Sequence, residues 1–188
     1  MRDFAGTVEE ARLLLARYPQ SGHAEQAMYD IGWSYYDMEE YGQSVTAFEA
    51  LVERFPGGYR ANRALFQIGE AHFAMEDFSA AIAYYRRLVE SQGLERMSER
   101  EVLQMKREKL AGLVDETALD LAAKALIRIG VCYEQIGEYE QAAEAFERIA
   151  TQFADERRLV EEAYRRQADM YYGQDDFQSC IDVYRRAV

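Results

Sequence analysis

The chain has 188 residues, of which 49% are hydrophobic and 13% aromatic, and only two are proline. This composition supports a substantial core, and the scarcity of proline favours helices over long linkers. The net charge of −12 argues against nucleic acid or anionic lipid as partners, because neutralising phosphates needs clustered Lys and Arg. No apolar run approaches the roughly 18 residues of a membrane span, so we expect no membrane insertion.

Residues 1–22 are expected to form half of a repeat. They carry an apolar stripe at helical spacing and end in Arg17-Tyr18-Pro19, which recurs 37 positions later as Arg54-Phe55-Pro56. This segment therefore corresponds to the second helix of a helix pair. Repeat arrays normally end in polar capping helices, and neither end of this chain shows one. We expect the chain to be a piece of a longer array; the alternative is a homo-oligomer formed through its terminal helices.

The rest of the sequence is organised by a helix pair that recurs four times, at residues 25–58, 62–95, 123–156 and 161–188. A small residue marks the first helix and recurs at offsets of 37, 61 and 38: Gly32, Gly69, Gly130 and Ala168. The aromatic that opens the second helix keeps the same steps: Tyr41, Phe78, Tyr139 and Phe177. Glycine inside a helix costs about 1 kcal/mol relative to alanine. Three glycines at one register therefore predict a close approach of the second helix, where Ser44, Ala81, Ala142 and Cys180 are also small.

The order of apolar residue, glycine, tyrosine, small residue, aromatic and proline resembles the tetratricopeptide repeat. The resemblance covers nearly the whole chain and implies an all-α, right-handed superhelical solenoid, a single domain over residues 1–188. The double aromatic Tyr35-Tyr36 and the Arg-aromatic-Pro ends further resemble a bacterial envelope subgroup. That subgroup includes the periplasmic cell-division coordinator of the Tol-Pal system and the repeat lipoprotein of the outer-membrane barrel assembly machine. It implies a periplasmic location, although the chain shows no signal segment and a cytoplasmic location stays open.

Residues 96–122 interrupt the repeats and are predicted to form a helical insert. The second and third repeats are 61 residues apart instead of 37. Ser98 and Glu101 form a capping box, and Met97 with Val102 fits the hydrophobic staple around it. The insert is either one added helix or a helical hairpin with a lengthened first helix of the third repeat.

The first helices of tetratricopeptide arrays line the concave face, and the resemblance implies which positions of each repeat point there. These positions predict a peptide-binding groove made of Tyr29, Trp33, Tyr36, Arg63, Phe66, Glu70, Phe73, Arg165, Asp169 and Tyr172. Its aromatic side chains suit an extended peptide or a helix, and its charges would set polarity. The alternative is that Tyr36, Phe73 and Tyr172 pack only against the insert or the next repeat.

Other chemistry-bearing residues have simpler interpretations. Carboxylates precede each second helix, and we interpret them as helix N-caps rather than a metal site: Glu39-Glu40, Glu76-Asp77, Glu138 and Asp175-Asp176. Cys132 and Cys180 are interpreted as buried thiols, and His72 as a core histidine with a hydrogen-bond partner. The sequence contains no nucleophile elbow or phosphate loop, so we expect no enzyme, no metal and no cofactor.

The sequence therefore predicts a scaffold that binds a protein or peptide in its concave groove, as part of a larger bacterial protein of envelope or complex assembly. The alternative is a structural module that self-associates through its ends or its insert and has no groove ligand.

Overall fold

The computed structural model describes residues 3–56, 60–91, 118–154 and 156–187, together with positions 104 and 107. Within these residues all regular structure is helical. The chain divides into two compact units, Met1–Ser91 and Gln92–Val188. Most of the predicted insert, including Ser98 and Glu101, lies outside the described residues.

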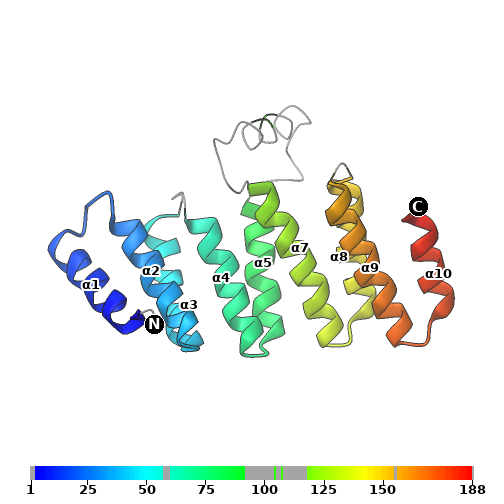
Figure 1. Ribbon diagram of the computed structural model, residues 1–188, viewed down its shortest axis with the longest axis horizontal. Helices are drawn as coiled ribbons and strands as arrows, with labels where there is room; N and C mark the ends of the chain where they lie inside the picture. Colours follow the sequence, from blue (N-terminus) through cyan, green and yellow to red (C-terminus); the bar gives the residue numbers. More distant parts are fainter. Residues whose placement is uncertain are drawn as a thin grey trace. The chain divides into compact units, whose positions relative to one another are not determined.

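The first unit contains five helices of 14 residues each: α1 (Phe4–Arg17), α2 (Ala24–Asp37), α3 (Tyr41–Arg54), α4 (Ala61–Ala74) and α5 (Phe78–Ser91). Each helix packs against the next one along the chain (Figure 1). The helices α4 and α5 begin 37 residues after α2 and α3, as the repeat predicts. The proline ends also behave as predicted, since α1 and α3 stop two residues before Pro19 and Pro56.

The second unit contains α7 (Ala118–Gln135), α8 (Tyr139–Gln152), α9 (Arg157–Gly173) and α10 (Phe177–Arg186). Consecutive helices again pack together. The helix α7 has 18 residues and begins before the predicted start of the third repeat. The first helix of the third repeat is therefore longer than the 14-residue first helices of the first two repeats, while the two alternatives for the insert stay predictions.

The glycine register exists because an aromatic ring of the second helix lies directly on the first. A Cβ added to Gly32 would lie 2.7 Å from two ring atoms of Phe48, and one added to Gly130 would lie 2.6 Å from Phe146. Gly69 meets Tyr85 in the same way. The small residue of the second helix is close as well, since the Ser44 hydroxyl donates to the Gly32 carbonyl at 2.8 Å. The predicted close approach is confirmed, and the ring is its main cause.

The acidic turns between paired helices share one backbone shape. The second of the three residues in each turn has a positive φ: 61° at Glu39, 59° at Glu76, 78° at Gly137 and 58° at Asp175. The predicted N-caps are only partly right. Asp77 and Asp176 each accept a backbone N–H bond at 3.1 Å, whereas the side chains of Glu40 and Glu138 make no capping bond.

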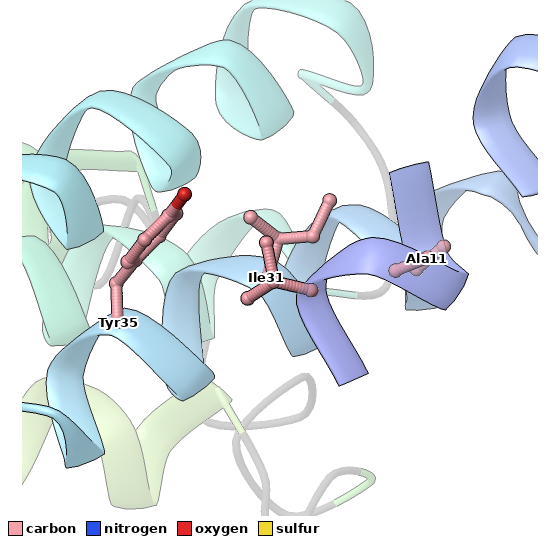
Figure 2. Close-up of a cluster of buried hydrophobic side chains, with 5 residues drawn as sticks. Ala11, Ile31 and Tyr35 are labelled. Carbon is pink, nitrogen blue, oxygen red and sulfur yellow. The ribbon is translucent and has the colours of Figure 1, made fainter. Parts of the chain in front are cut away.

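The cores are built from the apolar sides of adjacent helices. In the first unit Ala11 of α1 faces Ile31 and Tyr35 of α2, and all three are at most 9% exposed (Figure 2). Cys132 and Cys180 are free and buried, as predicted. His72 is partly buried and stacks on Tyr84, with ring centroids 5.4 Å apart. The hydrogen-bond partner predicted for it is wrong: Nδ1 lies 3.4 Å from the Asp77 carboxylate without making that bond.

Candidate peptide-binding surface

Three aromatic residues of α2 form a stacked ladder on one side of that helix. Tyr29 and Trp33 have ring centroids 6.5 Å apart and planes 9° apart, and Trp33 and Tyr36 follow at 5.7 Å and 17°. Spacings of four and three residues bring side chains to the same helix face, which explains the ladder. Trp33, the only tryptophan, is 36% exposed. Tyr29 also packs on the fully buried Phe48, with ring centroids 5.4 Å apart, and this contact fixes one end of the ladder to the core.

The equivalent residues of α4 are engaged more deeply in their own repeat. Phe66 packs on Tyr85 with ring centroids 5.5 Å apart, and the Tyr85 hydroxyl donates to the Glu70 carboxylate. Arg63, Phe66, Glu70 and Phe73 are all half-buried. Of the predicted groove residues in the first unit, Trp33 is therefore the most open to a ligand.

The predicted residues at the end of each first helix share an edge-to-face ring contact. Tyr36 packs on Tyr41, Phe73 on Phe78 and Tyr172 on Phe177, at 5.3 to 5.6 Å between centroids and 66 to 71° between planes. In each pair the partner opens the second helix of the same repeat. These residues thus pack inside their own repeat. Both predictions for them, a groove ligand and contact with the insert or the next repeat, had left this contact out. Tyr172 keeps 64% of its surface exposed despite this contact.

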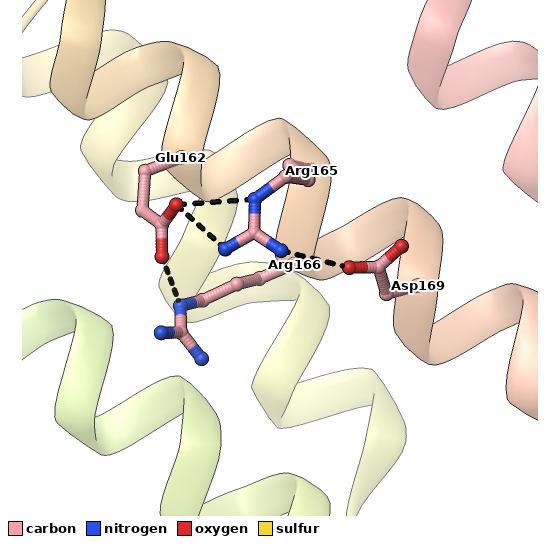
Figure 3. Close-up of polar contacts among 4 residues, drawn as sticks. All are labelled: Glu162, Arg165, Arg166 and Asp169. Carbon is pink, nitrogen blue, oxygen red and sulfur yellow. Dashed lines mark hydrogen bonds and ion pairs between the residues drawn. The ribbon is translucent and has the colours of Figure 1, made fainter.

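In the second unit the same surface is charged. Glu162 of α9 accepts bonds from Arg165 and Arg166, each at 2.7 Å, and Arg165 also reaches Asp169 at 3.1 Å (Figure 3). Burial opposes ionisation of Glu162, but the bonds from Arg165 and Arg166 outweigh it and hold the pKa of its carboxyl below its ordinary value. Arg165, Asp169 and Tyr172 are brought together on one helix, as predicted, and all three are exposed.

Glu134 and Arg166 also belong to this charged surface, although neither is among the predicted groove residues. Glu134 of α7 is half-buried, and its pKa is raised by burial, while Arg166 of α9 lowers it and Asp169 raises it. Glu134 occupies the position that Tyr36, Phe73 and Tyr172 hold in the other repeats. That single departure from the aromatic pattern was the signal in the sequence.

The arrangement suits recognition of a peptide. Among the residues that the structure describes, no three His, Cys, Asp or Glu side chains converge as metal ligands would. In that same part of the chain, no helix has the length and apolar character needed to cross a bilayer. What the first helices present is a ladder of rings in one unit and a cluster of guanidinium and carboxylate groups in the other, which are contacts that peptides use.

Repeated helix pairs with such a surface define a helical-repeat scaffold. Two family models, both described as tetratricopeptide repeat, match residues 29–94 and 124–155. The chain therefore belongs to the tetratricopeptide-repeat proteins, and the predicted fold class is confirmed. No curated protein sequence matches the chain.

Solved structures agree on the fold. The chain is similar to MamA at 19% identity and a TM-score of 0.63, covering 98% of this chain and 86% of MamA. It is similar to the apo form of RapI at 12% identity and a TM-score of 0.65, covering 99% of this chain and 63% of RapI. A third match is BtubC from P. vanneervenii, at 15% identity and a TM-score of 0.58, covering 98% of this chain and 69% of BtubC. At such identities the likeness concerns the fold alone.

Proposed function

We propose that the chain is a protein-binding scaffold that holds a peptide segment of its partner against the first helices of its repeats. The observation that carries this proposal is the half-exposed ladder of Tyr29, Trp33 and Tyr36. Contiguous exposed apolar patches mark interaction sites more often than single exposed residues do, and tryptophan and tyrosine are among the residues that contribute most to binding energy at interfaces.

The ladder is also pre-organised, which favours binding. Its rings are already stacked, and Tyr29 is fixed by Phe48, so little rotamer freedom is lost when a ligand arrives. On the second unit, considered by itself, the exposed Arg165 and Asp169 of α9 offer a peptide charges of both signs.

The test is to select peptides from a random display library against the whole chain and titrate them while following the fluorescence of Trp33. We expect the selected peptides to shift that fluorescence in the wild type. Titration calorimetry, which needs no tryptophan, should show that they bind Trp33→Ala at least about tenfold more weakly than the wild type. Leu13→Ala is the matched control, because Leu13 is an exposed apolar residue of α1 outside the ladder. Circular dichroism checks that both variants fold. Peptides that bind Trp33→Ala as well as the wild type would refute the proposal.

The finer assignment rests on the motif resemblance alone. We propose that the protein works in the bacterial periplasm, in envelope or complex assembly of the Tol-Pal or outer-membrane assembly kind. The Arg-aromatic-Pro ends support this subgroup, and in the structure Arg17 and Arg54 stack on Tyr18 and Phe55 at 5.5 and 5.4 Å. Fractionation of cells that express the tagged protein tests the location, and recovery in the cytoplasm would overturn it.

The competing function is self-association without a groove ligand. It predicts a concentration-dependent dimer in sedimentation that Trp33→Ala leaves unchanged. A monomer that captures peptides through Trp33 favours the scaffold instead.

A further inference from the structure

A second surface of the first unit holds an open apolar pocket with a volume of about 320 Å³. It lies between α1 and α3, over a different side of α2 from the aromatic ladder. Its floor is formed by Ile31 and Tyr35, both 8% exposed, and Ala47 of α3 forms part of its wall. A volume of this size is at the lower end of those that hold ligands.

The repeat itself shows what such a pocket would contain. Tyr84 stands 37 residues after Ala47, at the same position of the next repeat. Its ring stacks on His72 at 13° between planes, and its hydroxyl donates to the Glu49 carboxylate of α3. In the second repeat, therefore, the space between two second helices is filled by a phenol ring of the chain itself.

Each partner of Tyr84 has a counterpart in the pocket, and only the ring is replaced by a methyl group. Tyr35 stands at the position of His72 and offers a ring to stack on, and Arg12 stands at the position of Glu49. The Arg12 guanidinium donates to the Tyr35 hydroxyl at 2.7 Å. A guanidinium carries five N–H donors, so this bond leaves donors for an incoming group.

The exchange of Glu49 for Arg12 reverses the polarity that a ligand must have. Glu49 accepts the hydroxyl proton of Tyr84, whereas Arg12 can only donate, and it pairs best with a carboxylate. Arg12 is the one charged residue among those lining the pocket. The overall charge of −12 disfavours binding of an acidic peptide elsewhere on the surface. The Arg12 guanidinium therefore directs a carboxylate to this pocket.

We propose that this pocket binds an aromatic side chain of a partner peptide that carries Asp or Glu beside it. The ring lies on Tyr35 as Tyr84 lies on His72, and the carboxylate pairs with Arg12. This site is separate from the peptide-binding surface of the first helices and does not depend on it, because Met28, Ile31 and Tyr35 lie on another side of α2 from Tyr29, Trp33 and Tyr36.

The test uses the acetylated and amidated tripeptide Glu-Tyr-Glu, titrated into the labelled chain while amide NMR signals are followed. We expect the signals of Thr46 and Ala47 to shift, and Lys-Tyr-Lys and Glu-Leu-Glu to bind at least about tenfold more weakly. Ala47→Tyr should abolish binding, because it supplies the missing ring, and its melting temperature should equal or exceed that of the wild type. Ala74→Tyr, at an exposed position of α4, should bind like the wild type.

Arg12→Gln separates the charge from the cavity. It should remove the preference for Glu-Tyr-Glu over Lys-Tyr-Lys while some binding of the ring persists. Undiminished binding to Ala47→Tyr, or shifts centred on Trp33, would overturn the proposal. Tighter binding of free 4-hydroxyphenylacetate than of the tripeptide would overturn the assignment to a peptide.

Discussion

Replacing Gly32 by alanine should destabilise the first unit, although alanine is the better helix former. Two effects compete. The change of helix propensity favours the variant by about 1 kcal/mol. Against it, the new Cβ would lie 2.7 Å from Cδ1 and Cε1 of Phe48 and 2.8 Å from its Cζ, closer than real side chains approach.

The ring has little room to move away. Phe48 is fully buried, and Tyr29 packs against it at 5.4 Å. Forcing extra volume into such a core costs about 1–3 kcal/mol, so we expect a net loss of up to about 2 kcal/mol. The fluorescence of Trp33 should change as well, because any shift of Phe48 is passed through Tyr29 to the ladder.

Urea denaturation followed by circular dichroism measures the loss, and Gly42→Ala is the matched control. Gly42 is an exposed helical glycine with nothing within 4 Å of an added Cβ, so that variant should be neutral or gain up to about 1 kcal/mol. The double variant Gly32→Ala with Phe48→Leu should be more stable than the two single losses predict, because leucine makes room for the methyl group. A Gly32→Ala chain at least as stable as the wild type would refute the reasoning.

Further outcomes follow from the contacts or backbone angles of single residues. Glu49→Gln should lower the pKa of Tyr84 from about 12 towards 10, because the bond to the Glu49 carboxylate is the main cause of the raised value. Alkaline titration of tyrosinate absorbance measures this pKa. The control Ala83→Gly, on the exposed side of α5, should leave the pKa unchanged. Arg166→Gln should raise the pKa of Glu134 further, since burial raises it and Arg166 opposes this; NMR titration tests the direction. A carboxyl with a raised pKa in the folded state makes stability fall as pH rises through that pKa, so Glu134→Gln should gain on the wild type above it and not below. Glu39→Gly should stabilise the first turn by about 1 kcal/mol in urea denaturation, because φ is 61° there, and Gly137→Ala should cost a similar amount at φ 78°.

The sequence was sufficient to predict the fold because the packing contacts recur at the same positions of each repeat. Gly32, Gly69 and Gly130 each lie under a ring of the second helix, and the spacing of 37 residues relates the first two helix pairs. Such contacts are local to one helix pair, so a periodic pattern reports them directly. The N-caps were predicted less well, since glutamate at Glu40 and Glu138 has the right charge but makes no capping bond.

The surface was harder to predict, because helix position fixes a direction and not the degree of burial. The predicted positions did bring Tyr29, Trp33 and Tyr36 together, but the stacking of their rings depends on side-chain rotamers. Glu70 was chosen as a charge for a ligand, yet it accepts a bond from the buried Tyr85 hydroxyl. The pocket beside Ala47 could have been predicted from the sequence, because the position 37 residues later holds the large side chain of Tyr84.

The departures from the repeat are where function is to be sought, because packing already explains the residues that conform. Ala168 replaces the helical glycine in the fourth repeat, and Tyr184, at the position of the packed ring, is 49% exposed, whereas its counterparts Phe48, Tyr85 and Phe146 are at most 1% exposed. An alanine at the glycine position and an exposed ring thus occur in the same repeat. The same logic applies to Ala47 and Glu134: each lacks the ring that another repeat places there, and each leaves a cavity or a charge that its own repeat does not use for packing. Ala47→Tyr, which restores the ring of the next repeat, should remove binding at the pocket without unfolding the chain, whereas Gly32→Ala should destabilise the chain.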